Sequence, residues 1–546
     1  MIDNLIDGVK ILIQHIQNNN KIFIQVDSDV DGYTSASLLI NYLHLLFPAF
    51  VENNISYRLH NNKSHGVVID TIPKGIKLVI IPDAGSNQYE EHKMLAAAGI
   101  DVLVIDHHEA EMTSPHACVI NNQLCDYPTK SLSGVGMVYK FCSYIDKVLN
   151  INLADNFLDL VALGLISDVM DLRYFETKRL IDKGLECINS LFFNTMIEKQ
   201  AYSLKNELTP FGVAFYITPY INATIRVGSD AEKLLLFESF LDYKASELIP
   251  STKRGCKGEL ERRVDQAVRN CVNLKNQQTR IRDTEVEKIE KIIENEKLLD
   301  NKVLVVQLPI EAAANKSLTG LIANQLMSKY QRPVFVLNEK RTEVINEETK
   351  KSEQIITWEG SSRNFVKPNF DNLRHFVNES GLSLYAEGHP NACGVGFNND
   401  KIKDFITYSN QQLKDFDFTP THLVDFIFHN DSFRQEDIIE IGQLKSLWGQ
   451  GVEEPKIALE YIKITKDNIA LMSPDRNPTI KITLPNGTSI IKFKATMEEY
   501  ANLNPSEGYI LLNVVGKCEV NEWMGRCSGQ ILVEDYEIVS RSKFYF

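Results

Sequence analysis

The segment KIFIQVDSDVDGYTSASLL, residues 21–39, predicts a parallel α/β sheet with a carboxylate-rich loop at its edge. It opens on an apolar run, continues through three aspartates at alternate positions and a glycine, and ends in residues typical of a helix. A strand that leads through a short loop into a helix is the unit from which parallel sheets are built. Asp27, Asp29 and Asp31 would then lie beyond the carboxyl end of the strand, where open α/β sheets bind ligands.

Further strand and helix patterns alternate as far as residue 168. They are IFIQV at 22–26, TSASLLINYLHLLF at 34–47, LVIIP at 78–82, EEHKMLAAAG at 90–99 and VLVID at 102–106. This alternation predicts a parallel sheet with helices on its faces.

Acidic and imidazole side chains follow these runs. Asp83 comes directly after the second run, and Asp106, His107 and His108 end the third. Asp168 ends an apolar helical run, and a cap for the next helix is its alternative role. Carboxylate oxygen suits magnesium or manganese, and imidazole nitrogen suits manganese and other transition metals. Five Asp and one His therefore predict a site for two divalent cations about 3.5–4 Å apart. The six ligands are Asp27, Asp29, Asp31, Asp83, His107 and Asp168.

Other interpretations of these motifs are weaker. The start at Asp27 matches a D-x-D-x-D-G calcium loop, but Leu38 stands at the twelfth position, where a bidentate Glu is required. A solvated turn is the remaining alternative for the three aspartates. The chain has neither a G-x-S-x-G elbow nor a G-x-x-x-x-G-K-[ST] loop, which argues against a serine hydrolase and a P-loop enzyme.

The composition is that of a multidomain globular protein. The 546 residues are 44% hydrophobic and 24% charged, which predicts two to four domains. No run approaches the roughly 18 apolar residues of a membrane helix, and the N-terminus lacks a secretory pattern. We therefore expect a cytoplasmic protein without a membrane segment. The nine cysteines form no C-x-x-C pair, so neither a zinc knuckle nor a redox dithiol is indicated.

The net charge of −14 argues against nucleic acid as a partner, but one segment is basic. Residues 253–282 contain nine Lys or Arg and three acids, nine minus three giving +6. A nucleic-acid patch and a solvated helix face both remain open for this segment.

The patterns divide the chain into four parts. They are the α/β domain at 1–195, a mainly helical connector at 196–300, a second α/β domain at 301–415, and a C-terminal region at 416–546 that is strand-rich from about 455. The last part predicts a small β barrel or sandwich, with its best hairpin turn at Asn486 and Gly487.

Four motifs resemble those of the DHH phosphoesterase superfamily in order and spacing: VDSDVDG, PDAG, DHH and GLISDVMDL. The segment HACVINNQLCDYPTKSLSGVGMVYKF is similar to the RecJ branch, and the likeness continues through PYINATIRVGS, GSSR, EGHPNACGVGF and LWGQGVEEP. The resemblance covers nearly the whole chain. It implies a single-stranded-DNA-specific exonuclease of DNA repair or recombination that acts 5′ to 3′ with manganese or magnesium and releases 5′-mononucleotides. It also implies a DHH domain, a DHH-associated domain and a terminal OB-fold.

The resemblance assigns roles residue by residue. The metal ligands fall on the six residues named above, and the catalytic group is Asp83, His107, His108 and Asp168. His108 would adjoin the phosphate or support the metals. The implied substrate-binding residues are Asn222, Arg226, Ser361, Arg363, Gly388, His389 and Gly394. The chain departs from the family pattern at Tyr220, Glu387 and Cys393, which puts the grip on phosphate in question.

Two other functions compete with this one. A phosphodiesterase for short oligonucleotides or cyclic dinucleotides fits the same superfamily, but the strand-rich C-terminal part favours longer strands. Its candidate base-stacking residues are Tyr461, Tyr509, Trp523 and Tyr536, for which core packing is the alternative. A non-catalytic replication factor would be expected to have lost metal ligands, and none is missing. The expected partners are single-stranded DNA and a single-strand-binding protein or helicase.

Overall fold

The computed structural model describes residues 2–60, 65–205, 207–256, 258–345, 352–367, 369–419, 421–429, 432–475 and 477–542. The chain forms two compact units. Unit 1 comprises Met1–Ile225, Ser229–Asn270 and His422–Phe546, and unit 2 comprises Arg226–Gly228 and Cys271–Thr421. The four predicted domain ranges stay predictions. Among the described residues, no helix has both the length and the apolar character needed to cross a membrane.

The first sheet lies in unit 1, and its five described strands are all parallel, in the order β2-β1-β3-β4-β5. They are β1 (Lys21–Val26), β2 (Ile55–Leu59), β3 (Ile76–Pro82), β4 (Asp101–Asp106) and β5 (Cys118–Asn121). The predicted parallel α/β fold class is thereby confirmed. The strand order reverses between β1 and β3, which makes their carboxyl ends a topological switch point.

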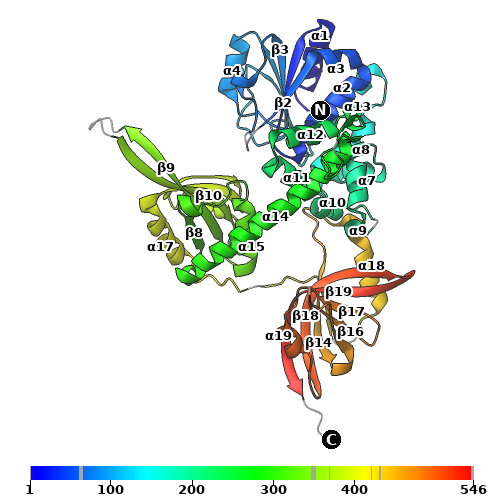
Figure 1. Ribbon diagram of the computed structural model, residues 1–546, viewed down its shortest axis with the longest axis vertical. Coiled ribbons are helices and arrows are strands. Elements are labelled where there is room, and N and C mark those ends of the chain that lie inside the picture. Colours follow the sequence, from blue (N-terminus) through cyan, green and yellow to red (C-terminus); the bar gives the residue numbers. More distant parts are fainter. Residues whose placement is uncertain are drawn as a thin grey trace. The chain divides into compact units, whose positions relative to one another are not determined.

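Helices cover both faces of this sheet, as the blue and cyan part of Figure 1 shows. They are α1 (Leu5–Gln17), α2 (Val30–Leu46) and α5 (Gly134–Leu149) on one face and α4 (Tyr89–Ala97) on the other. Successive side chains of a strand point to opposite faces, so a strand covered on both sides reads as a continuous apolar run. Val104 of β4 packs with Leu95 of α4, whereas its neighbour Leu103 lies against Gly8 of α1. Helix α6 (Leu158–Ser167) follows α5 and packs against α2.

The second sheet lies in unit 2, in the order β11-β12-β10-β9-β8. Its described strands are β8 (Leu304–Leu308), β9 (Val334–Ile345), β10 (Ser352–Arg363), β11 (Ser383–His389) and β12 (Ala392–Asn398). Only the β8–β9 pair is parallel among them. Helices α14 (Arg263–Asn295) and α15 (Thr319–Tyr330) pack on one face, and α16 (Leu373–Glu379) and α17 (Ile402–Gln412) on the other.

The C-terminal sheet has seven strands in the described part of the chain, ordered β13-β14-β18-β19-β17-β16-β15. They are β13 (Phe426–His429), β14 (Lys456–Ile464), β15 (Ile469–Met472), β16 (Thr479–Thr483), β17 (Ser489–Lys492), β18 (Tyr509–Trp523) and β19 (Arg526–Ser542). The strand-rich prediction and the hairpin between β16 and β17 are confirmed. Strand β14 lies second from one edge of this sheet and β15 forms the other edge, although the two strands are consecutive in the chain. The OB-like barrel stays a prediction.

The predicted stacking aromatics have different surroundings. Tyr461 is exposed, Tyr509 lies beneath the Lys463 ammonium at 4.5 Å, and Tyr536 is half-buried. The side chain of Trp523 lies outside the described residues.

The basic segment at 253–282 is largely neutralised where it belongs to unit 1. Glu261 pairs with Lys253 and Arg269, and Arg263 pairs with Glu238. Lys257 lies outside the described residues. For this part of the segment the solvated, ion-paired helix face is the better description.

Candidate metal centre

The carboxyl ends of three adjacent strands bring the first candidate ligands together. Asp27 follows β1, Asp83 follows β3 and His107 follows β4. The Asp83 N–H donates to the Ile105 carbonyl of β4 at 2.8 Å, which fixes these two strand ends against each other. Since β1 and β3 flank the switch point of the sheet, the site lies where this class of fold binds ligands.

The other three candidate ligands come from helix ends. Asp29 is the N-cap of α2 and accepts the Gly32 N–H at 2.9 Å, and Asp31 lies in the first turn of that helix. Asp168 follows the last residue of α6. The alternative role of Asp168 as a cap is wrong, because the next helix, α7 (Phe175–Glu186), begins after Tyr174.

The six residues form two groups of three. Ligand atoms within each group all lie within 4.8 Å of one another, and the groups are Asp27, Asp29 and Asp83, and Asp31, His107 and Asp168. The two groups meet at His107, whose Nε2 is 3.2 Å from Asp83 Oδ1 and 3.4 Å from Asp168 Oδ2. Asp83 also belongs to a third group with Asp106, His107 and His108.

Several buried atoms of this centre lack a hydrogen-bond partner among the described residues. They are Asp27 Oδ1, Asp83 Oδ1 and His107 Nε2. Burying such groups without a partner is unfavourable unless a ligand completes them. Hard carboxylate oxygens with one imidazole nitrogen suit Mn²⁺ or Mg²⁺, so the residues present fit divalent cations.

Glycines let other elements approach the aspartates closely. A Cβ at Gly134 of α5 would lie 2.3 Å from Asp83 Oδ1, and one at Gly164 of α6 would lie 2.5 Å from Asp31 Oδ1. Neither position leaves room for a larger residue. Asp83 itself has a φ of 67°, a conformation that L residues rarely adopt and that concentrates at functional sites.

The N-terminus of α5 holds the Asp31 carboxylate. The Gly134 N–H donates to Oδ2 at 2.6 Å, and the Ser133 hydroxyl and the Val135 N–H donate to Oδ1 at 2.8 and 3.2 Å. The positive end of the helix dipole also favours a negative charge there. The sequence motifs do not assign this role to the N-terminus of α5, although the Ser-Gly-Val-Gly start of the helix was a visible signal.

Crowding of acids raises several pKa values in the protein without metal. Burial and then the neighbouring charges of Asp27 and Asp31 raise the pKa of Asp29 to about 6. Burial, followed by the charge of Asp31, raises the pKa of Asp168 to about 8, and the same causes raise that of Asp83 well above its usual range. Bound cations would compensate this repulsion.

The buried Asp106 carboxylate holds the His108 ring by a hydrogen bond. The Ser86 and His107 N–H groups donate to its carboxylate at 3.0 and 2.7 Å, and His108 Nδ1 lies 2.8 Å from Asp106 Oδ1. Burial opposes protonation of His108, but its hydrogen bond and ion pair with Asp106 outweigh this and raise its pKa to about 9. His108 is therefore a half-exposed cation at the rim of an acidic site.

Two further histidines face Asp27, and sequence analysis did not select them. His65 Nδ1 lies 2.7 Å from Asp27 Oδ2, and the buried His60 Nε2 lies 3.9 Å from Asp27 Oδ1. His60 directly follows β2, His65 lies outside the described helices and strands, and neither belongs to a recognisable motif, so only the structure brings them to the metal centre.

The predicted substrate-binding residues of unit 2 lie on neighbouring strands. Ser361 and Arg363 are on β10, where Ser361 pairs with Gly394 of β12. Gly388 and His389 end β11, and both are exposed. Gly388 has a φ of 112°, which favours glycine.

Arg363 rests against the start of α15. A Cβ at Gly320 would lie 2.6 Å from its Nη2, and Ser361 Oγ lies 2.9 Å from Thr319 Oγ1. Burial lowers the pKa of Arg363, and among the described residues it has no ion pair with an acid. Asn222 and Arg226 lie on α11 (Thr218–Val227). Arg226 is exposed and belongs to unit 2, and its charge adds to the lowering of the Arg363 pKa.

Comparisons with known proteins agree with this geometry. The DHH family, N-terminal domain, matches residues 21–165. The SPbeta prophage-derived protein YorK of Bacillus subtilis (strain 168), which carries the name of a single-strand DNA-specific exonuclease, is 39% identical over 541 residues, covering 98% of this chain and 91% of YorK. The single-stranded-DNA-specific exonuclease RecJ of the same organism is 26% identical, covering 96% of this chain and 62% of RecJ.

A solved structure has a similar fold. The crystal structure of RecJ from Thermus thermophilus in complex with Mn2+ has a TM-score of 0.73 at 17% identity, and the match covers 99% of this chain and 72% of that one. The fold and the site define a DHH phosphoesterase. The chain belongs to the RecJ-like branch of the DHH family.

Proposed function

We propose that this protein is a metal-dependent exonuclease that hydrolyses single-stranded DNA from its 5′ end to 5′-mononucleotides. The observation that carries the proposal is the pair of ligand groups at the switch point of the first sheet. The names of YorK and RecJ supply the substrate class, and the manganese complex of RecJ supplies the metal. The 5′ to 3′ direction rests on family resemblance.

The six grouped residues are the proposed ligands of two divalent cations. Asp27, Asp29 and Asp83 would hold one cation, and Asp31, His107 and Asp168 would hold the other. Asp83 belongs to the first group, and its Oδ1 also lies 3.2 Å from His107 Nε2 of the second group. Manganese or magnesium bound there would supply an activated water and neutralise charge on the leaving oxygen.

His108 is proposed to contact the phosphate that is cut. Its Nδ1 faces Asp106, which leaves Nε2 to donate a proton in a hydrogen bond to a phosphate oxygen. Its raised pKa of about 9 keeps it cationic at neutral pH, as a contact to an anion requires.

The polar edge of unit 2 is proposed to bind the nucleotide end of the strand. Arg363 offers a guanidinium without an acidic partner among the described residues, beside the N-terminus of a twelve-residue helix. Gly388 and Gly394 let the backbone come close to phosphate, and His389 lies between them in the chain. Asn222 and Arg226 are proposed to contact phosphate as well.

End-labelled single strands test the proposal directly. With Mn²⁺ or Mg²⁺, a 5′ label should appear at once as mononucleotide, whereas a 3′ label should pass through progressively shorter strands. A chelator should stop both. Release of mononucleotide from the 3′ end first would reverse the direction, and activity that survives chelation would remove the two-metal assignment.

A comparison of substrate lengths separates this proposal from a phosphodiesterase of short oligonucleotides. Turnover of a dinucleotide equal to or better than that of a long strand would favour the latter. A cytoplasmic location, and a single-strand-binding protein or helicase as partner, are proposals that follow from the function.

A further inference from the structure

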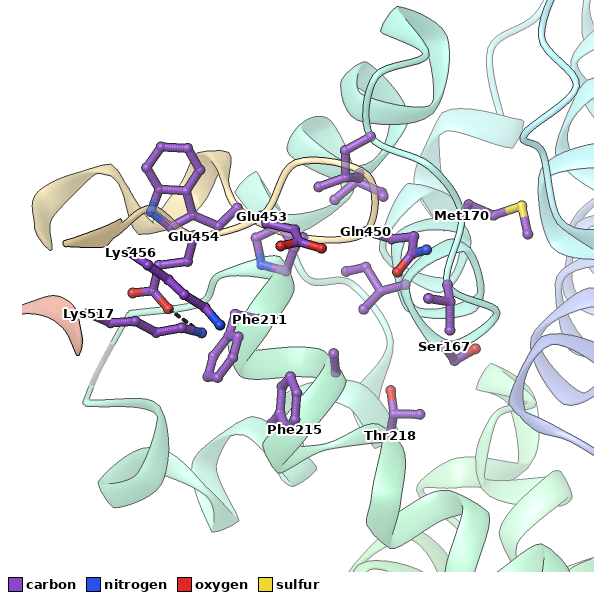
Figure 2. A pocket seen from close by; sticks show the side chains of 18 residues that line it. Ser167, Met170, Phe211, Phe215, Thr218, Gln450, Glu453, Glu454, Lys456 and Lys517 are labelled. Carbon is purple, nitrogen blue, oxygen red and sulfur yellow. Dashed lines mark ion pairs between the residues drawn. The ribbon is translucent and has the colours of Figure 1, made fainter. Parts of the chain in front are cut away.

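A cavity of about 500 Å³ opens in unit 1 beside the turn that carries Asp168. Ser167 and Val169, the two neighbours of Asp168, both line it. The opposite walls come from α10 (Pro210–Tyr216) and from the segment 448–456 (Figure 2). Its size falls within the range of about 300–1,000 Å³ that organic ligands occupy in proteins.

The walls of this cavity carry exposed aromatic rings. Phe211 and Phe215, one turn apart on α10, stack with ring centroids 4.3 Å apart and an interplanar angle of 27°. Their side chains are 40% and 60% exposed, and Trp448 also lines the cavity. Large apolar groups left in water at one place mark a binding surface.

The cavity also has a polar rim. Figure 2 shows Gln450 and Glu453 on the side opposite the two phenylalanines, and Lys456 and Lys517 at the end away from Ser167. Both lysines are ion-paired: Lys517 pairs with Glu454 at 3.2 Å, and Lys456 pairs with Glu534 at 2.9 Å. Flat apolar walls with hydrogen-bonding groups at the edge complement a nucleobase: the ring face stacks on the aromatic side chains, and the ring edge forms hydrogen bonds.

The cavity is fixed to the metal centre. The Leu172 N–H donates to the Gln450 carbonyl at 2.9 Å and joins the segment 448–456 to the turn after α6. Val169 has a φ of 58°, a rare conformation for a β-branched residue. The backbone turn at Val169 leaves its side chain exposed in the cavity, while the preceding residue, Asp168, contacts His107.

We propose that this cavity is a nucleobase-binding site, in which Phe211, Phe215 and Trp448 stack bases of the strand whose phosphate is cut at the neighbouring metal centre. The inference rests on the proposed function and deepens it. The occupant is a base of the polynucleotide, because the site shares its turn with the proposed ligand Asp168 and offers ring faces with hydrogen-bonding groups at the rim. A stacking wall tolerates all four bases, so it adds affinity without sequence preference.

The test is a double-mutant cycle between the protein and the strand. The affinity of the full-length protein for a 20-nucleotide strand is measured by fluorescence anisotropy in chelator, so that no cleavage occurs. The strand is scanned with single abasic sites. Phe211→Ala/Phe215→Ala should weaken binding of the intact strand by about 5- to 100-fold, as loss of base stacking does. The same variant should show almost no further loss when the strand is abasic at the position that occupies the cavity.

Two other variants act as controls. Phe215→Trp keeps a stacking face and should bind like the wild type. Tyr202→Ala removes an aromatic that is 98% exposed and lies outside the cavity, and it should change nothing. Because both phenylalanines are exposed, thermal unfolding of the double variant should match the wild type.

The outcomes separate this inference from the proposed function. Non-additive effects of the double variant and of one or a few abasic positions on the affinity support the nucleobase-binding site. An equal loss of affinity on every strand, including a fully abasic one, would overturn the inference. Unchanged affinity in the double variant would also overturn it and would make the cavity a binding site for a protein partner. Failure of the wild type to cleave single strands with Mn²⁺ would defeat the proposed function instead, and the binding cycle does not depend on cleavage.

Discussion

The metal centre of unit 1 and the polar edge of unit 2 are opposite in charge and in burial. The first gathers buried carboxylates that raise one another's pKa, as at Asp83 and Asp168. The second exposes Gly388 and His389 beside Arg363, a guanidinium without an acidic partner among the described residues. The metal centre needs bound cations to balance its carboxylates, and the polar edge of unit 2 needs a bound anion to balance Arg363. The comparison predicts that damage to the first slows the chemical step, whereas damage to the second weakens substrate binding.

The largest effect is expected from Asp83→Ala. Asp83 belongs to one ligand group and lies 3.2 Å from His107 Nε2 of the other, so its loss should lower kcat by about 10³-fold or more, because metal stabilisation of the transition state is worth several kcal/mol. Initial rates on end-labelled strands measure this, and circular dichroism checks the fold. Asp171→Ala is the matched control: this nearby acid pairs with Arg173 at the surface and should matter little. Retained activity in Asp83→Ala would contradict the two-metal assignment.

The second-largest effect is expected at the polar edge of unit 2. Arg363→Ala should raise KM for a long strand by roughly 10- to 100-fold, since charge-assisted hydrogen bonds contribute about 1.5–3 kcal/mol. The value of kcat should change far less. Arg363→Lys should recover only part of the loss, because an ammonium cannot grip two oxygens at once.

Steady-state kinetics at several strand concentrations give the split between KM and kcat. Arg341→Ala is the control, an arginine of the adjacent β9 that already pairs with Glu339. A fall in kcat without a change in KM would erase the distinction between the two regions.

A smaller effect is expected from a residue that supports a proposed metal ligand and is not itself a ligand. Ser133→Ala removes the hydroxyl that donates to Asp31 Oδ1, while the Gly134 and Val135 N–H donors remain. The manganese concentration for half-maximal activity should rise about 10-fold, as is common when a supporting hydrogen bond is lost, and saturating metal should restore the rate. An unchanged manganese requirement would show that the α5 N-terminus alone holds Asp31.

The smallest effect concerns stability in chelator. The pKa values of Asp29 and Asp168 are raised to about 6 and about 8, so the folded chain keeps protons that the unfolded chain releases above about pH 4. Stability of the metal-free protein should therefore fall as pH rises from 5 to 8, and His108 acts in the same direction. Calorimetry should show a decrease of several degrees in Tm. Added Mn²⁺ should reverse it, and a rise in Tm with pH in chelator would contradict the raised pKa values.

Much of the first sheet and its site could be predicted because the signals are local. The strand runs at 22–26, 78–82 and 102–106 and the acids that follow them are contiguous in sequence, and parallel strands bring their carboxyl ends to one edge. The donors to Asp31 come from residues more than one hundred positions away, and His65, which contacts Asp27, belongs to no sequence motif. No sequence window contains these contacts.

The sequence by itself determined the acid-bearing strand ends, the α/β class and the family resemblance, because strand periodicity and alternating aspartates are properties of short segments. Only the tertiary structure decided how the six residues divide into two groups, which helix N-terminus holds Asp31, and that an aromatic cavity adjoins Asp168. Those features join segments as distant as α6 and residues 448–456. Packing in three dimensions, and not local preference, sets the distances between them.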